Sequence, residues 1–145
     1  QHGKGSQSIF YDRKDVLYAS LHARPEDEYP FLMGYANEIG TGDGKGYNLN
    51  IPMPIGTTFD LYKKNLKIAL KQISDYDPEV LVLSLGVDTF EGDPVGGFKL
   101  QSPDFEVIGN LIAELSIPTH FIMEGGYLME ALGENVKNVV TGFSS

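Results

Sequence analysis

Short apolar runs alternate with helical patterns along the chain and predict an α/β protein. Four runs have the length and composition of buried strands, at residues 16–22, 48–53, 80–85 and 120–123. Apolar residues recur at helical spacing in three further segments, at Phe59, Tyr62, Leu66, Ala69, Leu70 and Ile73, at Phe105, Ile108, Leu111, Ile112 and Leu115, and at Leu132, Val136, Val139 and Val140. Because strands and helices alternate, we expect a parallel sheet with right-handed crossovers and helices on both faces.

Capping residues and turn residues set the expected boundaries of these elements. Thr57 or Thr58 is suited to cap the first of the three helices, and Ser102 to cap the second with Pro103 in its first position. The last helix is expected to begin at Leu128 or Met129. Residues 23–46 show no clear periodicity, and loops of this length in compact domains are usually functional or mobile.

Composition narrows the class of protein. The 145 residues, 41% of them apolar, suit a single domain over 1–145 with one core. The chain has no cysteine, so a metal would need oxygen or imidazole ligands, and the histidines are His2, His22 and His120. With no signal-like segment and no apolar run of about 20 residues, we expect a soluble, cytoplasmic protein without membrane contact.

The formal net charge of −9 bears on the partners. Nucleic acid is disfavoured, because neutralising phosphates requires clustered lysines and arginines. A small cation such as a polyamine would be attracted by this field. The alternative is that the acidic balance serves only solubility.

Two predicted strands end in residues that carry chemistry. Asp88 follows the strand at 80–85, and Tyr127 follows the strand at 120–123 after Gly125 and Gly126. Open parallel sheets bind ligands beyond the carboxyl ends of their strands, so both side chains are expected at one edge.

The segments Gly86 to Glu91 and Glu124 to Tyr127 resemble those of zinc-dependent deacetylases of the histone deacetylase superfamily. The resemblance continues through 2–7, 20–22, 40–42 and 50–52 and is strongest to the acetylpolyamine amidohydrolases. It implies the arginase/deacetylase fold, of which this chain would hold the later strands, as a C-terminal part. The implied activity is hydrolysis of an acetamide on a polyamine or lysine-like amine.

The same resemblance assigns roles to individual residues. Asp88 would be a zinc ligand, and Tyr127 would donate a hydrogen bond to the scissile carbonyl. Gly125 and Gly126 would let the backbone approach the substrate. Tyr29 would form an aromatic wall of the substrate tunnel, although a hydrophobic loop anchor is the alternative.

A potassium site is implied at Phe10, Arg13, Val16 and Tyr47. His22 matches part of another potassium site, but we favour a partly buried, hydrogen-bonded histidine. Glu26, Asp27 and Glu28 would select the distal ammonium of a polyamine, or would form an ordinary solvated loop.

The family's remaining zinc ligands come from an Asp-x-His pair whose histidine falls on position 1, which is Gln1 here. His2 matches the following histidine, which is not a ligand. Three hypotheses follow: a hydrolase, an inactive scaffold that binds partners or forms a homo-oligomer, and one part of an enzyme completed by an N-terminal half. Without the strand that leads into this pair, we expect a gap between residues 16–22 and 80–85. The sheet would then close in a new order or pair with a second copy.

Overall fold

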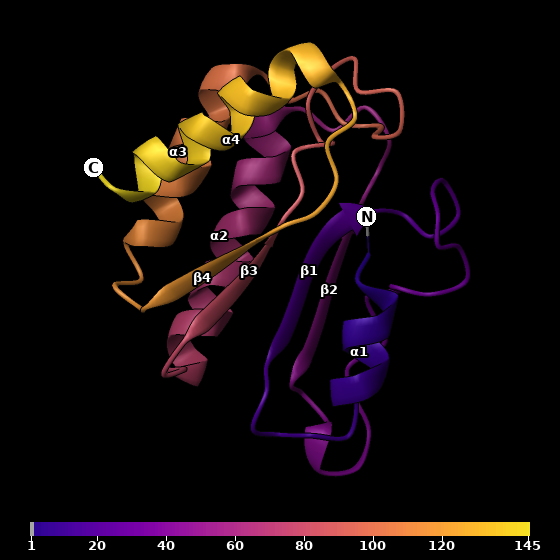
Figure 1. Ribbon diagram of the computed structural model, residues 1–145. Helices are drawn as coiled ribbons and strands as arrows, with labels where there is room; N and C mark the ends of the chain where they lie inside the picture. Colours follow the sequence, from indigo (N-terminus) through magenta and orange to yellow (C-terminus); the bar gives the residue numbers. More distant parts are fainter. Residues whose placement is uncertain (1) are drawn as a thin grey trace.

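The computed structural model describes residues 2–145 and consists of strands and helices in alternation (Figure 1). The elements in chain order are α1 (Lys4–Phe10), β1 (Tyr18–Ala23), the 3-10 turn η1 (Gly42–Gly44), β2 (Asn48–Met53), α2 (Phe59–Tyr76), β3 (Leu81–Leu85), α3 (Ser102–Ala113), β4 (Thr119–Met123) and α4 (Met129–Phe143). Across the described residues, none of the helices combines the length and the apolar character that a membrane crossing requires.

The strands form two separate parallel pairs. β1 pairs with β2 from Tyr18 opposite Asn48 to Ala23 opposite Met53, and β3 pairs with β4 from Leu81 opposite Thr119 onward. Figure 1 shows the two pairs apart from each other, and β1 and β3 share no ladder in the described part of the chain. The expected gap is therefore present, and closure of the sheet in a new order is not. Pairing with a second copy stays a prediction.

One apolar core joins both strand pairs to α2, α3 and α4. Leu21, Ala23 and Met53 turn one face of the β1–β2 pair toward this core, and α2 contributes Leu66 and Leu70. The largest side chains buried within it include Phe105, Leu100, Val87 and Val139. In Figure 1, α3 and α4 lie against each other beside the β3–β4 pair.

The opposite face of the β1–β2 pair is polar and is covered by α1. Because side chains alternate along a strand, Asn48 and Asn50 point away from the apolar core. Both donate to Gln7 of α1, whose side chain is almost completely buried. The β1–β2 pair thus has helices on both faces, as predicted, although α1 itself was missed because its seven residues carry no apolar stripe.

Element boundaries differ from the sequence expectations by one or two residues. β1 begins at Tyr18 rather than at 16, because Tyr18 is the first residue paired with β2. Gln101, not Ser102, is the N-cap of α3, and its backbone N–H donates to Asp104 Oδ2 at 2.7 Å. Thr58, one of the two predicted candidates, takes the N-cap position of α2, but its side chain makes no capping bond.

Candidate active site

The ends of β3 and β4 continue side by side beyond the strands. Glu124 N donates to Leu85 O at 2.9 Å, and Val87 N donates to Gly125 O at 2.8 Å. These bonds hold the turn after β4 against the turn that contains Asp88. The predicted meeting of the two strand ends is therefore present in the structure.

Asp88 is a buried carboxylate packed against glycine backbone. The residue as a whole, Asp88, is 5% exposed. A Cβ on Gly125 would lie 2.2 Å from Asp88 Oδ2, and one on Gly86 would lie 3.1 Å from Oδ1. A side chain at position 125 would displace the carboxylate, so glycine there leaves room for Asp88.

Asp88 lies at the end of a strand but does not cap the turn that follows. The hydrogen bonds of the described residues include none to its side chain. A buried carboxylate normally acquires hydrogen bonds, a cation or a proton. The arrangement suits a cation ligand better than a capping side chain.

Asp93, five residues later, is the side chain that organises this edge. Its Oδ2 accepts from Tyr127 N at 2.8 Å and from Leu128 N at 3.1 Å, and its Oδ1 accepts from Val95 N and Gly96 N. Burial raises the pKa of Asp93, but these four donors outweigh it and leave the pKa below the usual value. Asp93 therefore fastens the backbone of Tyr127 to the loop that carries Asp88.

Sequence reasoning missed Asp93. An aspartate directly before a proline, as in Asp93-Pro94, is a signal for a turn that the side chain caps. That signal predicts the bonds to Val95 and Gly96. It gives no indication of the bonds to Tyr127 and Leu128, which lie more than thirty positions away.

Tyr127 extends from a turn that only glycine permits. Gly126 has a φ of 149°, and a Cβ there would lie 2.7 Å from Val87 Cγ2 and 2.8 Å from Leu132 Cδ1. The Tyr127 side chain itself is half-exposed, at 48%. An exposed phenol on a fixed backbone is available to a ligand and does not serve the core.

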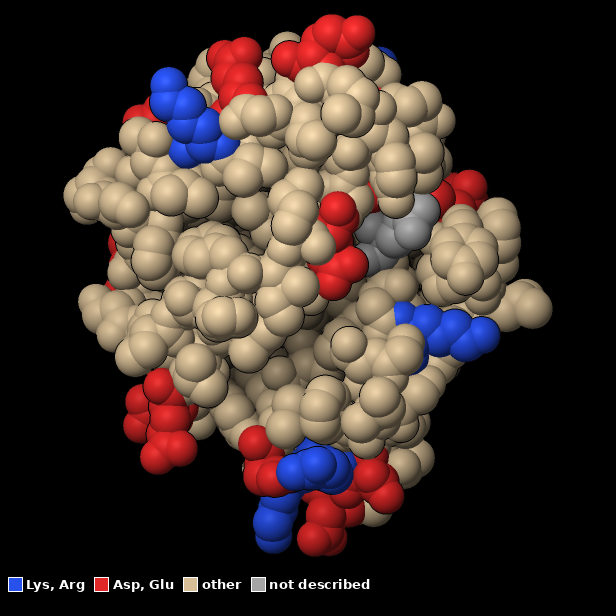
Figure 2. Space-filling view, viewed as in Figure 1, with Lys and Arg blue, Asp and Glu red and all other residues tan. Residues whose placement is uncertain are grey.

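A narrow crevice lies between the end of β1 and the Asp88 loop. His22, Ala23, Glu28, Asp88 and Phe98 are among its lining residues. Figure 2, viewed as in Figure 1, shows the face between the strand pairs hollowed near its middle, with acidic side chains at the rim. The crevice therefore carries negative charge where the strand ends meet.

The negative charge of Asp88 raises the pKa values of two nearby side chains, Glu28 and Tyr62. Burial raises the pKa of Glu28, and the Asp88 charge raises it further. Burial together with Asp88 raises the pKa of the Tyr62 phenol to about 12. A positive group entering the crevice would relieve this repulsion.

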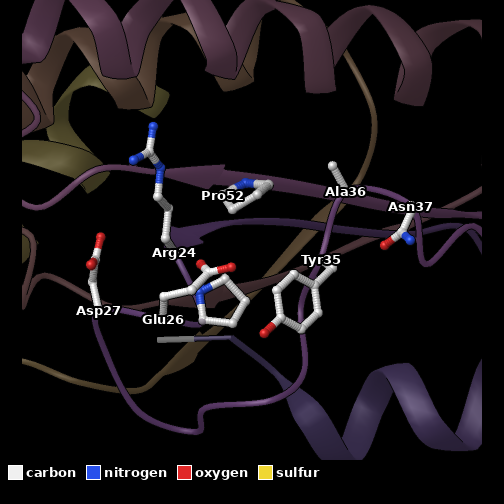
Figure 3. A pocket seen from close by; sticks show the side chains of 8 residues that line it. Arg24, Glu26, Asp27, Tyr35, Ala36, Asn37 and Pro52 are labelled. Atoms are coloured by element: carbon white, nitrogen blue, oxygen red, sulfur yellow. The ribbon is translucent and has the colours of Figure 1, made fainter.

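The acidic run at 26–28 divides between two sides of its loop. Glu28 faces the Asp88 crevice, whereas Glu26 and Asp27 line an outer cavity of about 520 Å³ together with Arg24 and Tyr35 (Figure 3). From the sequence we expected Glu26, Asp27 and Glu28 to act as one group. The turn of the loop separates them because Asp27 N and Glu28 N both bond back to Arg24 O.

Tyr29 lies next to Glu28 and is 63% exposed. Its ring meets Phe31, also half-exposed, edge to face at 6.4 Å. Neither ring is buried in the core, so the interpretation as a hydrophobic anchor fails. The position beside the crevice agrees with an aromatic wall, which stays a prediction.

The segments of the predicted potassium site lie together. Tyr18 N donates to Tyr47 O, and a Cβ on Gly44 would lie 2.6 Å from Arg13 N. The carbonyls of Phe10 and Tyr47 each accept one backbone hydrogen bond and retain a second lone pair. The geometry is compatible with main-chain ligation, and occupation by potassium stays a prediction.

His22 is a buried, hydrogen-bonded histidine, as favoured from the sequence. It is 2% exposed, and its ring nitrogens lie 2.9 Å from Ser20 Oγ and 2.8 Å from Gly34 O. A carbonyl only accepts, so Nε2 carries the proton and Nδ1 accepts from the serine. Burial and the nearby His2 lower the pKa of His22 to about 4.

Asp88 fits one ligand position of a metal ion, on the basis of its burial and its lack of a described hydrogen bond. Among residues 2–145, no three His, Cys, Asp or Glu side chains converge on one point where a metal would be held. Gln1, which the resemblance places at a ligand position, lies outside the described residues.

Comparison with known proteins identifies the family. The model of the histone deacetylase domain matches residues 1–143. The chain belongs to the histone deacetylase family. Among curated members, it is 51% identical over 142 residues to acetylpolyamine amidohydrolase 1 of Pseudomonas aeruginosa and 47% identical over 141 residues to the acetylpolyamine amidohydrolase of Mycoplana ramosa.

The fold of this family member agrees with solved structures of the family. The crystal structure of the acetylpolyamine aminohydrolase from Burkholderia pseudomallei superposes on the whole chain with a TM-score of 0.98 at 40% identity. The match to the Pseudomonas protein covers 98% of this chain but only 41% of that protein. The match to the Burkholderia structure covers 42% of the Burkholderia chain. This chain therefore represents about two fifths of these relatives and shows an incomplete arginase/deacetylase-like fold.

Proposed function

We propose that the protein hydrolyses the acetamide bond of small acetylated amines, with acetylated polyamines as the substrate class. The observation that carries the proposal is that backbone bonds between the ends of β3 and β4 bring the turn with the buried Asp88 and the turn with the exposed Tyr127 to one edge. The similarity to three acetylpolyamine amidohydrolases over nearly the whole chain supports the same reaction.

Tyr127 would act on the carbonyl oxygen of the acetamide. Its hydroxyl donates a hydrogen bond that strengthens as negative charge develops on that oxygen. Asp93 holds the backbone of Tyr127, and the Gly125–Gly126 turn lets the substrate approach. These residues require little rearrangement when the substrate binds, because each is fixed by backbone bonds before binding.

Asp88 would supply one carboxylate ligand to a zinc ion. Zinc, when bound, supplies Lewis-acid chemistry and favours attack of water on the carbonyl. Further ligands and the general acid and base would come from groups outside Asp88 and Tyr127. Potassium at the Phe10, Arg13, Val16 and Tyr47 carbonyls would brace the turn between α1 and β1.

The acidic crevice favours an amine with a second positive charge. Glu28 would face the substrate cation on the Asp88 side of the loop, and Tyr29 would line the alkyl chain. The formal charge of −9 adds a long-range attraction for polyamines. Lysine-like acetylated amines carry the same groups and belong to the same substrate class.

The test measures hydrolysis of N-acetylputrescine by the protein with its complete natural sequence, together with zinc content. We expect Tyr127→Phe to lower kcat on the order of a hundredfold with KM nearly unchanged, because only the oxyanion contact is lost. Asp88→Asn should remove the zinc measured by mass spectrometry. Tyr76→Phe, a matched change on the far end of α2, is the control. Full activity of Tyr127→Phe, or zinc retained in Asp88→Asn, would contradict the proposal.

A second candidate function is binding through strand edges. β1 and β3 each have one side without a paired strand in the described residues, and unpaired parallel edges present backbone donors and acceptors. A second copy, or an N-terminal half of a relative, would fill this space. Light scattering that reports only monomers, combined with zinc-dependent turnover, would favour the hydrolase alone.

A further inference from the structure

The segment 24–39 carries both Glu28 and Tyr29 and is called here the entrance loop. It leaves β1 at Arg24, whose N–H bonds to Met53 O at 2.9 Å and so extends the β1–β2 ladder by one residue. It returns to the sheet at Gly34. Between these points Tyr29 is 63% exposed and does not belong to the apolar core.

The returning half of the entrance loop is held by side chains from the sheet and α1. Gly34 O accepts from His22 Nε2 at 2.8 Å, and Gly34 N donates to Glu38 Oε2 at 2.8 Å. Asn50 Nδ2 donates to Tyr35 O at 3.2 Å. Each bond joins the loop to a buried side chain or to another part of the loop, so the loop is fastened from below.

Glu38 lies at the centre of these bonds. In addition to Gly34 N, its Oε2 accepts from Gln7 Nε2 at 2.7 Å and from Asn50 Nδ2 at 3.3 Å. Gln7 and Asn50 are 1% and 3% exposed. The carboxylate thus connects the loop to the polar layer beneath α1, where its hydrogen bonds are shielded from water and gain strength.

At Gly34 the backbone of the loop lies in close contact with the sheet. Its φ is 101°, and a Cβ would lie 2.6 Å from His22 Nε2 and 3.1 Å from the His2 ring. The backbone approaches the two histidines as closely as glycine allows. Loss of the Glu38 contact would remove the bond to Gly34 N and leave only the bonds from His22 and Asn50 to hold the loop on the sheet.

We propose that Glu38 is a positioning residue that sets substrate affinity through the entrance loop. By fixing Gly34 it fixes the chain that carries Tyr29 and Glu28 beside the Asp88 crevice, and so holds the aromatic and acidic walls for an alkyl-amine substrate. The inference rests on the proposed function for its substrate. The role of Glu38 in holding the loop does not depend on the proposed function.

The test compares Glu38→Ala and Glu38→Gln in the protein with its complete natural sequence. For Glu38→Ala we expect KM for N-acetylputrescine to rise about tenfold while kcat stays within about threefold, because the loop and not the reacting groups is disturbed. Hydrogen exchange of the backbone amides at 31–36 should accelerate. Glu38→Gln keeps an accepting oxygen and should restore most of both properties.

Asn37→Ala, an exposed change next to Glu38, is the matched control and should alter neither property. Unchanged exchange in Glu38→Ala would overturn the proposal. So would a loss of kcat and thermal stability with unchanged KM, because this is the outcome of a merely structural role. If the unmodified protein shows no turnover, the proposed function fails, and the exchange measurement alone decides whether Glu38 fastens the loop.

Discussion

Asp88 and Asp93 lie in one loop and are both buried, at 5% and 7% exposure, yet they meet different surroundings. Four backbone N–H groups point at Asp93, whereas glycine backbone packs around Asp88 without a described hydrogen bond. The first carboxylate is satisfied by the fold. The Asp88 carboxylate has no hydrogen-bond partner among the described residues and can bind a positively charged ligand, which is why we assign it a functional role.

Asp93→Asn tests the organising role of Asp93. We expect a loss of about 2 kcal/mol in unfolding free energy at neutral pH, since a neutral amide accepts the N–H groups less strongly. The folded pKa of Asp93 is lowered, so its stabilisation is present above the usual aspartate pKa and is lost as pH falls through the folded value. Urea unfolding at pH 7 and pH 3 should therefore show a difference between the two proteins that shrinks in acid. A constant difference would contradict this role.

His22 provides a second dependence on pH. Its folded pKa of about 4 lies below the ordinary histidine value of 6.5, so in acid the unfolded state takes up a proton that the folded state does not bind. Stability should fall as pH drops from about 6.5 to 4, by as much as about 3 kcal/mol. His22→Gln, which retains a donor for Gly34 O, should flatten this part of the profile. Identical profiles from denaturant titrations would refute the assignment.

At the scale of elements, α3 and α4 cross at two glycines. A Cβ on Gly109 would lie 2.1 Å from Val139 O, and one on Gly142 would lie 2.0 Å from Glu106 O. Each glycine thus admits the backbone of the other helix. The apolar periodicity of both segments predicts that they are helices, but not this close approach.

Gly109→Ala should therefore destabilise the protein. Separating the two helices to fit a methyl group costs about 1–3 kcal/mol. Gly133→Ala on α4 is the matched control, because nothing lies within 4 Å of its added Cβ, and a gain of about 0.5–1 kcal/mol is expected from helix propensity. Thermal denaturation of both variants gives the comparison. Equal shifts in Tm would show that the crossing is not tight.

At the scale of the whole molecule, the negative net charge attracts the proposed cationic substrate. A formal charge of −9 raises the local concentration of polycations, and salt screens this attraction beyond about 8 Å at physiological ionic strength. We expect KM for an acetylated polyamine to rise about threefold between low salt and about 0.3 M sodium chloride. KM for an uncharged acetamide of similar length should stay constant. A parallel rise for both substrates would indicate a general salt effect.

The gap between the strand pairs belongs to the same scale. Each pair has its own ladder and contributes to the core, but β1 and β3, which lie on the two sides of the gap in Figure 1, share no ladder in the described chain. The Burkholderia structure superposes on this chain with a TM-score of 0.98 although the chain covers only 42% of it. The arrangement is thus the local geometry of the family.

The sequence by itself determined what depends on neighbours along the chain. Apolar runs and helical spacing predicted four strands and three helices, and the positions of Asp88 and Tyr127 after two parallel strands predicted that they reach one edge. Family resemblance gave the proposed roles. These features follow from local backbone preferences and periodic burial, which a linear pattern records.

Tertiary structure decided what depends on residues distant in sequence. Asp93 reaches Tyr127 across 34 positions, and Gln7 reaches Asn50 across 43. The pattern could not predict α1, because its buried face is polar and its partners lie on β2. Glu28 and Asp27 are adjacent in sequence but face opposite sides of the entrance loop. A hydrogen bond satisfies a buried polar group only when the fold brings the partner to it, and no local signal specifies that partner.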